Sequence, residues 1–566
     1  MGIGVLEPKS DAVVPGTVLL QDHGDDTTVD NDARGNNEEV ILEPQPSNDP
    51  NDPLNWPLGK KVAMVMIVYL GAVVHSGTTA PLLISGNVQI SKDLHIPLSK
   101  MVQLSLGYFI LAAGAICPFI AAFARKYGKR PVYVLSSIVA TVGCIVGATA
   151  SGYNSLLAAR ILQGIGQAAC ETLTFNTIGD VLFVHQRGLP VALGVLCINV
   201  TINIVGIISG AITTRLGWRY CFWILLPFAI IQMLLAFFFV AETSYRRNSV
   251  DRLNAGHRSK LHSTNDASSV DANYEFEEQI SRDDTLKDNA SKLENVVSHQ
   301  ASENQPTRKS WIQELRLYNG PFADDPMWKI FLAFPAVLLN LGVSFAVFSC
   351  GLCLTWFGGT VTIASILFPA PPYNYTTIQV GYASVAPAIG SLLASIFMGL
   401  TLDHLVSKLT RHNRGVYEPE FQLPLTFAGG ACVIAGMVST GYTFGKGSSV
   451  YIVSVCWAIA SFGFACCNVT YFNYALSAYS DYTVEIIVMS VMFRNFLGYV
   501  LSLFVVPWLE RNGPLVVYSS LAGTIAATLL LVGAFYVLGK RYRLFWHRHN
   551  LLQRLQLEAK KPRASE

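Results

Sequence analysis

Long apolar runs recur along the chain, and they restrict its possible folds more than any other feature. Crossing a bilayer as a helix, with all backbone polar groups hydrogen-bonded, takes about 20 apolar residues. Twelve runs of roughly that length are predicted to be membrane spans, six in each half of the chain. They lie near residues 61–84, 103–124, 131–150, 156–178, 189–212, 220–241, 329–352, 377–401, 424–443, 449–472, 485–508 and 515–538. The predicted fold class is therefore an all-α polytopic membrane protein.

The composition agrees with a lipid environment. Of the 566 residues, 51% are hydrophobic and 14% are charged, whereas soluble domains carry about 25% charged residues. The formal net charge of +2 does not favour a nucleic acid as a partner. We expect no cofactor, no metal site and no enzyme activity, because the sequence lacks a phosphate-binding loop, paired metal ligands on a helix and a nucleophile elbow. We expect a monomer in the lipid bilayer.

A polar stretch between the sixth and seventh runs divides the chain into two halves. It is rich in Ser, Asn, Asp, Glu, Lys and Arg, so it cannot bury enough apolar surface to offset the entropy of ordering. Two six-helix bundles related by a pseudo-twofold axis are the layout that holds a substrate near the membrane midplane. The predicted parts are a disordered cytosolic tail (1–60), an amino-terminal bundle (61–243), a flexible cytosolic linker (244–326), a carboxyl-terminal bundle (327–539) and a basic cytosolic tail (540–566).

Basic residues in the short loops predict the orientation. Lys and Arg gather after even-numbered spans, as in 125–130 and 408–414, and are missing from 151–155 and 367–379. Because such residues stay on the cytosolic side, both termini are predicted to be cytosolic. We expect no signal peptide, so that the first span directs insertion. Asn374 lies in an outside loop within a glycosylation sequon, and the expected location is the plasma membrane.

The fourth span carries the most informative polar pattern. Arg160, Gln163, Gln167, Glu171 and Thr174 recur every three or four residues, which places them on one face of a helix. Polar side chains within a membrane commonly mark substrate or ion pathways. Arg160 and Glu171 lie about 16 Å apart along the helix axis and cannot pair with each other. Glu171 is therefore predicted to be free to bind a cation or a proton, and the alternative is a structural residue hydrogen-bonded to neighbouring spans.

Other polar residues within the spans are candidate contacts of a transported solute. Arg160 and Gln167 are expected to provide the polar surroundings of Glu171. The further candidates, for which hydrogen bonding or packing between helices is the alternative, are Asn199, Asn203, Asn340, Asn468 and Tyr471. Small residues at Gly206 and Gly210 favour close packing of the fifth span. His75 in the first span is expected to be a hydrogen-bonded helix contact.

Several motifs resemble those of the major facilitator superfamily. Residues 160–164 resemble its Arg-x-x-x-Gly pattern, and residues 127–133 resemble the basic end of its loop signature between the second and third spans. The fungal drug:proton antiporter family with twelve spans has segments similar to 52–57, 217–223 and 413–420. Within that family, 124–130 and 180–188 look most like the yeast polyamine and histidinol permease branch. The resemblance implies the major facilitator fold, a small-molecule substrate and proton coupling.

The predicted gating residues are Arg125, Arg130, Asp180, Asp403 and Arg494. The family's loop signature usually has Asp where Arg125 stands, so the gating ion pair is expected to be rearranged. In the fifth span, residues 205–206 replace a Gly-Pro pair of the antiporter signature, which weakens an inference of export. Ser477 stands where relatives often have Asp, so one carboxylate of a polyamine-like site is expected to be missing.

These observations lead to one main hypothesis and two alternatives. The main hypothesis is a proton-coupled transporter of small organic solutes, with organic cations as the expected substrates, that works by alternating access. The alternatives are an antiporter that exports drugs or secondary metabolites, and a non-transporting membrane sensor built on a carrier fold. The solute cannot be read from the sequence, because several spans contribute side chains to its pocket.

Overall fold

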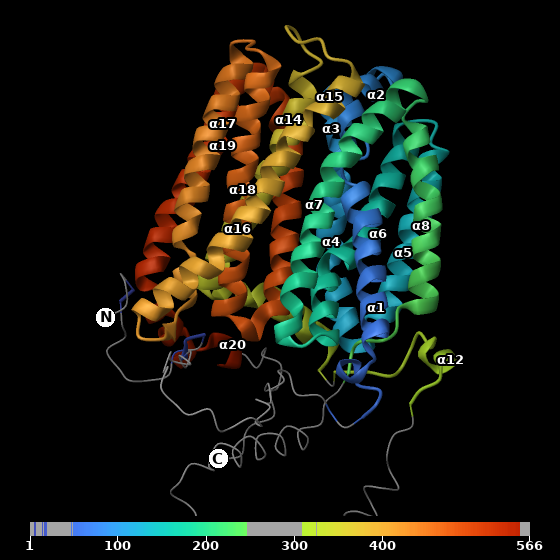
Figure 1. Cartoon of the computed structure of the whole chain (residues 1–566). Coiled ribbons are helices and arrows are strands. Elements are labelled where there is room, and N and C mark those ends of the chain that lie inside the picture. The colour runs from blue at the N-terminus through green and yellow to red at the C-terminus, as the bar shows by residue number, and fades with distance from the viewer. Residues whose placement is uncertain are drawn as a thin grey trace, which may run out of the picture.

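The computed structural model describes residues 5–6, 14, 16–19, 47, 49–245, 308–323 and 325–554. Long helices run side by side through the molecule, with the first half of the chain on one side and the second half on the other (Figure 1). The helices of the first half are α1 (Leu58–Gly71), α2 (Asn87–Asp93), α3 (Leu98–Val102), α4 (Tyr108–Tyr127), α5 (Arg130–Ala148), α6 (Tyr153–Val181), α7 (Val184–Arg215) and α8 (Arg219–Phe239). Those of the second half are α12 (Trp311–Glu314), α13 (Met327–Ala336), α14 (Leu341–Leu367), α15 (Thr377–Ala383), α16 (Val385–His412), α17 (Pro424–Gly445), α18 (Val450–Ala478), α19 (Thr483–Arg548) and α20 (Leu551–Arg554).

The described helices account for the twelve predicted spans. Nine helical stretches in this part of the chain are long and apolar enough to cross a membrane. One of them contains α19, in which Gly513 has a φ of 73° and separates two helices. The remaining two spans are α6, whose polar stripe lowers its hydrophobicity, and α7, which includes the apolar stretch Val200–Arg215. The prediction of an all-α membrane fold is confirmed.

The seventh span begins later than predicted. The sequence placed it near 329–352, but the long helix α14 covers Leu341–Leu367, and the short helix α13 precedes it. No charged residue occurs between Lys329 and the end of α14, so hydrophobicity alone could not locate the boundary. It is set by Asn340, whose side-chain oxygen accepts hydrogen bonds from the first backbone N–H groups of α14. Such a cap satisfies donors that the helix itself leaves unpaired.

Each half packs as one bundle, and the two bundles meet along a shared interface. In the first bundle, α5 packs against α6 and α8, and α4 packs against α6. In the second bundle, α17 packs against α18 and α19, and α14 packs against α19. Between the bundles, α4 contacts α19, and α7 contacts α15 and α16. Large apolar side chains remain exposed on the outer faces, as Phe228 and Phe239 do on α8, which is the pattern of a lipid-facing surface.

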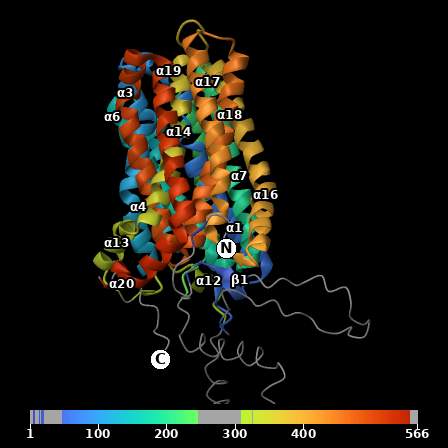
Figure 2. The same ribbon diagram turned by 90° about the vertical axis from the view of Figure 1, so that its left-hand side faces the viewer.

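The two ends of the molecule differ. At one end, here called the terminal end, lie α12, α13 and α20 (Figure 2). At the opposite end, here called the loop end, lie α2 and α15 (Figure 1). At the terminal end, strand β1 (Val18–Leu19) from the amino-terminal tail pairs antiparallel with β2 (Val416–Tyr417). Most of the predicted linker over 244–326, and most of the predicted tail over 1–60, lie outside the described residues.

Candidate functional site

Glu171 lies at the interface between the bundles, where each of its carboxylate oxygens contacts at least one polar side chain. Its Oε1 forms an ion pair with the Arg494 guanidinium. Its Oε2 accepts hydrogen bonds from Gln167 Nε2 at 3.2 Å and from Asn495 Nδ2 at 3.3 Å. Glu171 and Gln167 belong to α6 of the first bundle, and Arg494 and Asn495 belong to α19 of the second. One carboxylate therefore links the two halves of the molecule.

The surroundings of Glu171 are only partly closed to solvent. The side chains of Arg494 and Glu171 are 25% and 13% exposed. Glu171 lies ten residues before the end of α6, which is about 15 Å along the helix. The neighbouring Gln167 is buried, and its Oε1 has no hydrogen-bond partner among the described residues. An unpaired buried amide oxygen is costly, so this position is suited to accept a hydrogen bond from a proton donor or a solute.

The expectation that Glu171 is free was wrong for this conformation. The polar stripe was correctly assigned to one helix, but the partner of Glu171 comes from the eleventh span, and Asn495 is 324 residues away in the sequence. A pairing between distant spans cannot be read from helical periodicity. Arg494 was predicted as a gating residue, and the structure brings it directly to Glu171. Asn495 was not among the predicted site residues.

Arg160 is fully buried and forms a separate contact cluster. Its guanidinium donates hydrogen bonds to the carbonyl oxygens of Thr79 at 3.0 Å and Ser105, and to Gln163 Oε1 at 3.0 Å. It also lies over the Phe109 ring, 4.5 Å from its centroid. Several donors of Arg160 are thus held by backbone carbonyls that follow α1 and precede α4. The prediction that Arg160 and Glu171 do not pair is confirmed, since they have different partners.

A cavity of about 750 Å³ opens between the bundles at the terminal end. Leu173 and Asn176, which follow Glu171 on α6, line it from the first bundle, and Val484 and Glu485 line it from the start of α19. The cavity therefore approaches Glu171 from the terminal side. Its volume lies within the range of pockets that hold small organic molecules.

An ion pair crosses this cavity between the bundles. Arg125 of α4 and Glu485 of α19 are 2.8 Å apart, and their side chains are 28% and 13% exposed. The pair explains why this chain has an arginine at position 125, because its carboxylate partner stands in the opposite bundle. The expected rearrangement of the gating pair is in line with this contact.

The other predicted gating residues lie within single bundles. Arg130 donates hydrogen bonds to the carbonyl oxygens of Val240 and Phe237 at the end of α8, where a cation stabilises the helix terminus. Asp180 pairs with Lys129 at 2.6 Å, inside the first bundle. Asp403 is exposed on α16. These three residues do not meet one another at a gate in this conformation.

The predicted solute contacts fall into different places. The side chain of Asn199 lies outside the described residues. Asn203 is buried on α7. Asn340 caps α14 near the terminal end, so the expectation that it lies inside a span was wrong because the helix begins one residue later. Asn468 Oδ1 accepts a hydrogen bond from Cys350 at 3.0 Å. Tyr471 is buried beside Phe345, with ring centroids 5.9 Å apart.

At the loop end the two bundles pack closely, and glycines lie at the points of contact. A Cβ atom on Gly210 would lie 2.7 Å from the Thr377 carbonyl oxygen, and one on Gly381 would lie 2.8 Å from the Gly206 carbonyl oxygen. Such distances leave no room for a methyl group, so the backbones of α7 and α15 approach directly. The predicted packing role of Gly206 and Gly210 is confirmed. The molecule is therefore closed at the loop end and hollow at the terminal end.

His75 also forms a contact between two helices, in this case through a hydrogen bond. Its Nε2 lies 2.8 Å from Gln232 Oε1 on α8, and both side chains are buried. This hydrogen bond joins the first and sixth spans. The expectation of a hydrogen-bonded helix contact is confirmed.

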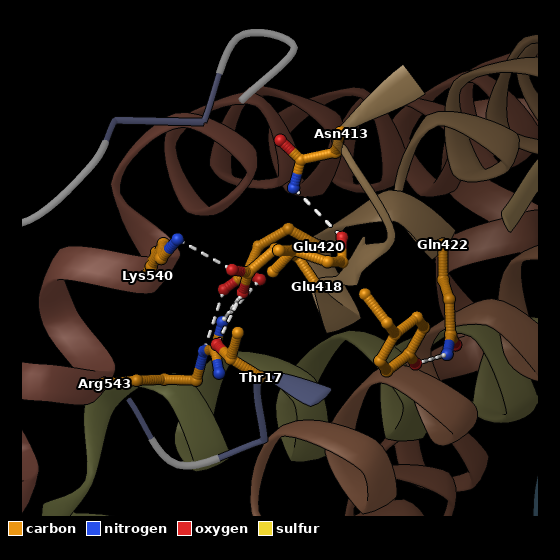
Figure 3. A network of polar contacts seen from close by, with 9 residues as sticks. Thr17, Asn413, Glu418, Glu420, Gln422, Lys540 and Arg543 are labelled. Carbon is orange, nitrogen blue, oxygen red and sulfur yellow. Dashed lines mark hydrogen bonds and ion pairs between the residues drawn. The ribbon is translucent and has the colours of Figure 1, made fainter. Parts of the chain in front are cut away.

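A second group of charged residues, here called the acidic cluster, lies at the terminal end of the second bundle (Figure 3). Arg543 donates to both oxygens of Glu420, from Nε at 3.0 Å and from a terminal nitrogen at 2.8 Å. The same terminal nitrogen lies 2.7 Å from Glu418, whose other oxygen is 2.7 Å from Lys540 Nζ. Thr17 Oγ1 of the amino-terminal tail donates to Glu418 at 2.8 Å. The sequence did not identify this cluster, although residues 413–420 carried part of the resemblance.

Known proteins with similar sequences identify the family of this chain. The model of the Major Facilitator Superfamily matches residues 63–503. The uncharacterized MFS-type transporter C1271.10c of Schizosaccharomyces pombe is 24% identical over 561 residues, which cover 94% of this chain and 92% of the relative. Protein HOL1 of Saccharomyces cerevisiae is 21% identical over 548 residues, which cover 92% of each protein.

A solved structure shows the same fold. The crystal structure of the human organic anion transporter MFSD10 (TETRAN) matches with a TM-score of 0.51 at 12% identity, covering 84% of this chain and 100% of that one. The family match spans both bundles and most of the interface that holds Glu171 and Arg494. The chain therefore belongs to the Major Facilitator Superfamily, and it is a multi-pass membrane transporter of small molecules rather than an enzyme.

Proposed function

We propose that this transporter takes up small organic cations together with protons, by alternating access of its two bundles. The observation that carries the proposal is the ion pair between Glu171 and Arg494, which joins the bundles inside the membrane. A carboxylate in such a place is costly unless it has a partner or a function. Glu171 is the proposed binding group for a proton or for a cationic solute.

The contacts of Glu171 suggest how protonation couples to movement. When Glu171 is ionised, its negative charge attracts Arg494 across the interface. When it binds a proton, that attraction is lost, and the bundles separate more easily at this depth. Protonation therefore shifts the equilibrium between the conformations of the two bundles, and a cationic solute that binds more tightly to one conformation is coupled to the proton through that equilibrium.

The cavity at the terminal end supports the proposed route. It leads from the terminal end toward Glu171, while the glycine contacts close the loop end. We assign the terminal end to the cytosol, because basic residues follow the even-numbered spans there. In that orientation the conformation described here opens to the cytosol, Asn374 faces the outside as a glycosylation site, and the plasma membrane is the proposed location. Gln167, Asn203, Asn468 and Tyr471 are proposed pocket residues.

The test of coupling compares Glu171→Gln with Asp180→Asn. Both substitutions remove one carboxylate from α6, but Asp180 pairs with Lys129 inside the first bundle. In a yeast strain that lacks its own polyamine transporters, labelled spermidine is offered as the probe cation at several external pH values. We expect Glu171→Gln to reduce accumulation at least tenfold and to remove its dependence on the proton gradient. Asp180→Asn should keep that dependence. Unchanged accumulation and pH dependence in Glu171→Gln would disprove the proposed role of Glu171.

The direction of transport is tested in the same cells. Uptake predicts that wild-type cells accumulate the labelled cation above cells without the transporter. Export predicts the opposite, with lower accumulation and better growth in the presence of toxic cations. A sensor predicts no exchange of any solute, so counterflow in proteoliposomes separates a transporter from a sensor.

A further inference from the structure

Exposed apolar side chains gather on the segment that leads from the linker to the second bundle. This segment, residues 308–322, contains α12 and is here called the collar. Its side chains of Trp311, Ile312 and Tyr318 are 54%, 74% and 62% exposed. Large aromatic and aliphatic groups are rarely presented in this number to water. A partner surface for the collar is therefore needed.

The collar is fastened to the terminal end of the first bundle. The Glu314 carboxylate pairs with Lys60 at the start of α1 at 2.6 Å. The Glu314 carbonyl oxygen accepts a hydrogen bond from Arg130 at 2.6 Å. Farther along, the Phe322 N–H donates to the Lys126 carbonyl oxygen at 2.8 Å. The collar thus runs along the ends of α1, α5 and α4, on the side of the molecule where α12 is drawn in Figure 1.

Two ring contacts place the apolar side chains at the edge of the lipid-facing surface. Trp311 stacks on Phe238 at the end of α8, with ring centroids 6.5 Å apart and 19° between the planes. Tyr318 lies 6.2 Å from Tyr127 at the end of α4, and Tyr127 in turn contacts Phe123. Phe238 and Phe123 are exposed on spans that cross the membrane, so they face lipid. The collar therefore lies where the hydrocarbon region gives way to the headgroups, the depth at which Trp and Tyr are enriched.

The charge of the collar is complementary to one kind of lipid surface. Arg308, Lys309 and Arg316 are exposed. Glu314 is the single acidic residue between 308 and 322, and its charge is already paired with Lys60. The collar presents a positive surface beside its apolar one. This combination fits a layer of anionic headgroups above hydrocarbon.

We propose that the collar is a membrane-surface anchor, which binds anionic lipid headgroups in the leaflet at the terminal end. Trp311, Ile312 and Tyr318 insert at the headgroup boundary, and Arg308, Lys309 and Arg316 bind the lipid charges. The identity of this leaflet as the cytosolic one rests on the orientation proposed above. The binding itself does not depend on the substrate or on proton coupling, so the two proposals fail independently.

Hydrogen exchange of the full chain in lipid nanodiscs tests this anchor. One set of nanodiscs contains zwitterionic phosphatidylcholine alone, and the other contains phosphatidylcholine with phosphatidylserine. Each basic side chain near an anionic surface strengthens binding by about fivefold. We expect backbone exchange over 308–322 to slow by roughly tenfold in the anionic nanodiscs, with no comparable change in the loop over 413–418.

Two matched double variants separate the collar from general charge effects. Arg308→Gln with Lys309→Gln removes two charges from the collar, and Lys408→Gln with Arg411→Gln removes two exposed charges from α16 at the same end of the molecule. We expect the first variant to lose most of the lipid-dependent protection and the second to keep it. Trp311→Ser with Ile312→Ser should raise exchange in both lipids.

Several outcomes would overturn the proposal. Equal exchange in the two lipids would exclude anionic headgroups as the partner. Equal loss of protection in both charge variants would indicate a general surface effect. Protection that appears only when a soluble protein is added would identify a protein partner for the collar instead.

Discussion

The ion pair at the bundle interface and the acidic cluster use the same chemistry for different purposes. Glu171 and Arg494 join the two bundles, and their side chains are 13% and 25% exposed. Glu418, Glu420 and Arg543 all belong to the second bundle, and each is at most 1% exposed. The acidic cluster has an additional cation, Lys540, and a bidentate contact. The interface pair has neutral amides around it instead.

This difference shows how a carrier can keep some charged contacts permanent and others reversible. Breaking a fully buried pair leaves an uncompensated charge and is strongly destabilising. A pair that retains access to water and to amide donors loses less when its partners separate. We infer that the acidic cluster keeps the second bundle rigid, whereas the interface pair is remade in each transport cycle. Three substitutions test this distinction.

The largest expected effect is that of Arg543→Met. It leaves Glu418 and Glu420 buried without their main cation, which costs about 3–5 kcal/mol of stability. The thermal unfolding midpoint of the purified protein should fall markedly, and the yield from membranes should fall with it. A triple variant that combines Arg543→Met with Glu418→Gln and Glu420→Gln should recover part of the loss. Wild-type unfolding in Arg543→Met would show that the cluster does not stabilise the bundle.

A smaller effect on stability but a clear effect on transport is expected for Arg494→Gln. The free energy of unfolding should fall by less than in Arg543→Met, by about 1–3 kcal/mol, because Glu171 keeps two amide donors and is partly exposed. Coupling between proton and solute should weaken by roughly 5- to 150-fold, the range of typical coupling energies. Accumulation of labelled spermidine at two external pH values measures this coupling. If Arg494→Gln instead unfolds as readily as Arg543→Met, the distinction between the two groups is wrong.

The smallest expected effect is that of Glu485→Gln at the cavity. Its pair with Arg125 crosses the bundles in a partly exposed position, where such pairs contribute about 0.2–1 kcal/mol. The pair is formed in the conformation that is open at the terminal end and closed at the loop end, so its loss should disfavour that conformation. A cysteine placed at the buried Ser384 should then react about two- to fivefold faster with an alkylating reagent.

Two controls sharpen the measurement at Ser384. Arg125→Gln should speed the reaction to the same degree as Glu485→Gln, and the double variant should add nothing further. High salt should reduce the difference from wild type, since it screens exposed charges. Slower alkylation in Glu485→Gln would mean that the pair stabilises the conformation that is closed at the terminal end.

Sequence reasoning was reliable wherever the information is local. The lipid environment follows from runs of apolar residues, and the common face of Gln167 and Glu171 follows from helical periodicity. The packing role of Gly206 and the helix contact of His75 follow from residue type and position. Each of these predictions needed only residue type and local spacing, whereas the partner helices, α8 for His75 and α15 for Gly206, were not predicted.

The same reasoning failed where contacts are distant or a boundary is weakly marked. Nothing near Glu171 indicates that Arg494 lies opposite, because tertiary packing alone brings α6 and α19 together. Asn340 was misplaced since apolar residues continue on both sides of it, and its capping role becomes visible only from the backbone. The acidic cluster escaped notice because Glu418 and Arg543 lie in segments that look like solvated loops and tails.

Because the collar is bound to the first bundle, the effective connection between the bundles is shorter than the sequence indicates. Counted in the sequence, the predicted linker is more than eighty residues long. The Phe322 N–H, however, is held by Lys126 on the first bundle, and Met327 already begins α13. Four residues, 323–326, remain between these points, and a fully extended chain over that distance spans at most about 18 Å. As long as the collar stays bound to the first bundle, residues 323–326 are the effective connection between the bundles. The distance between the bundles at this edge is then limited by these four residues and not by the full length of the predicted linker.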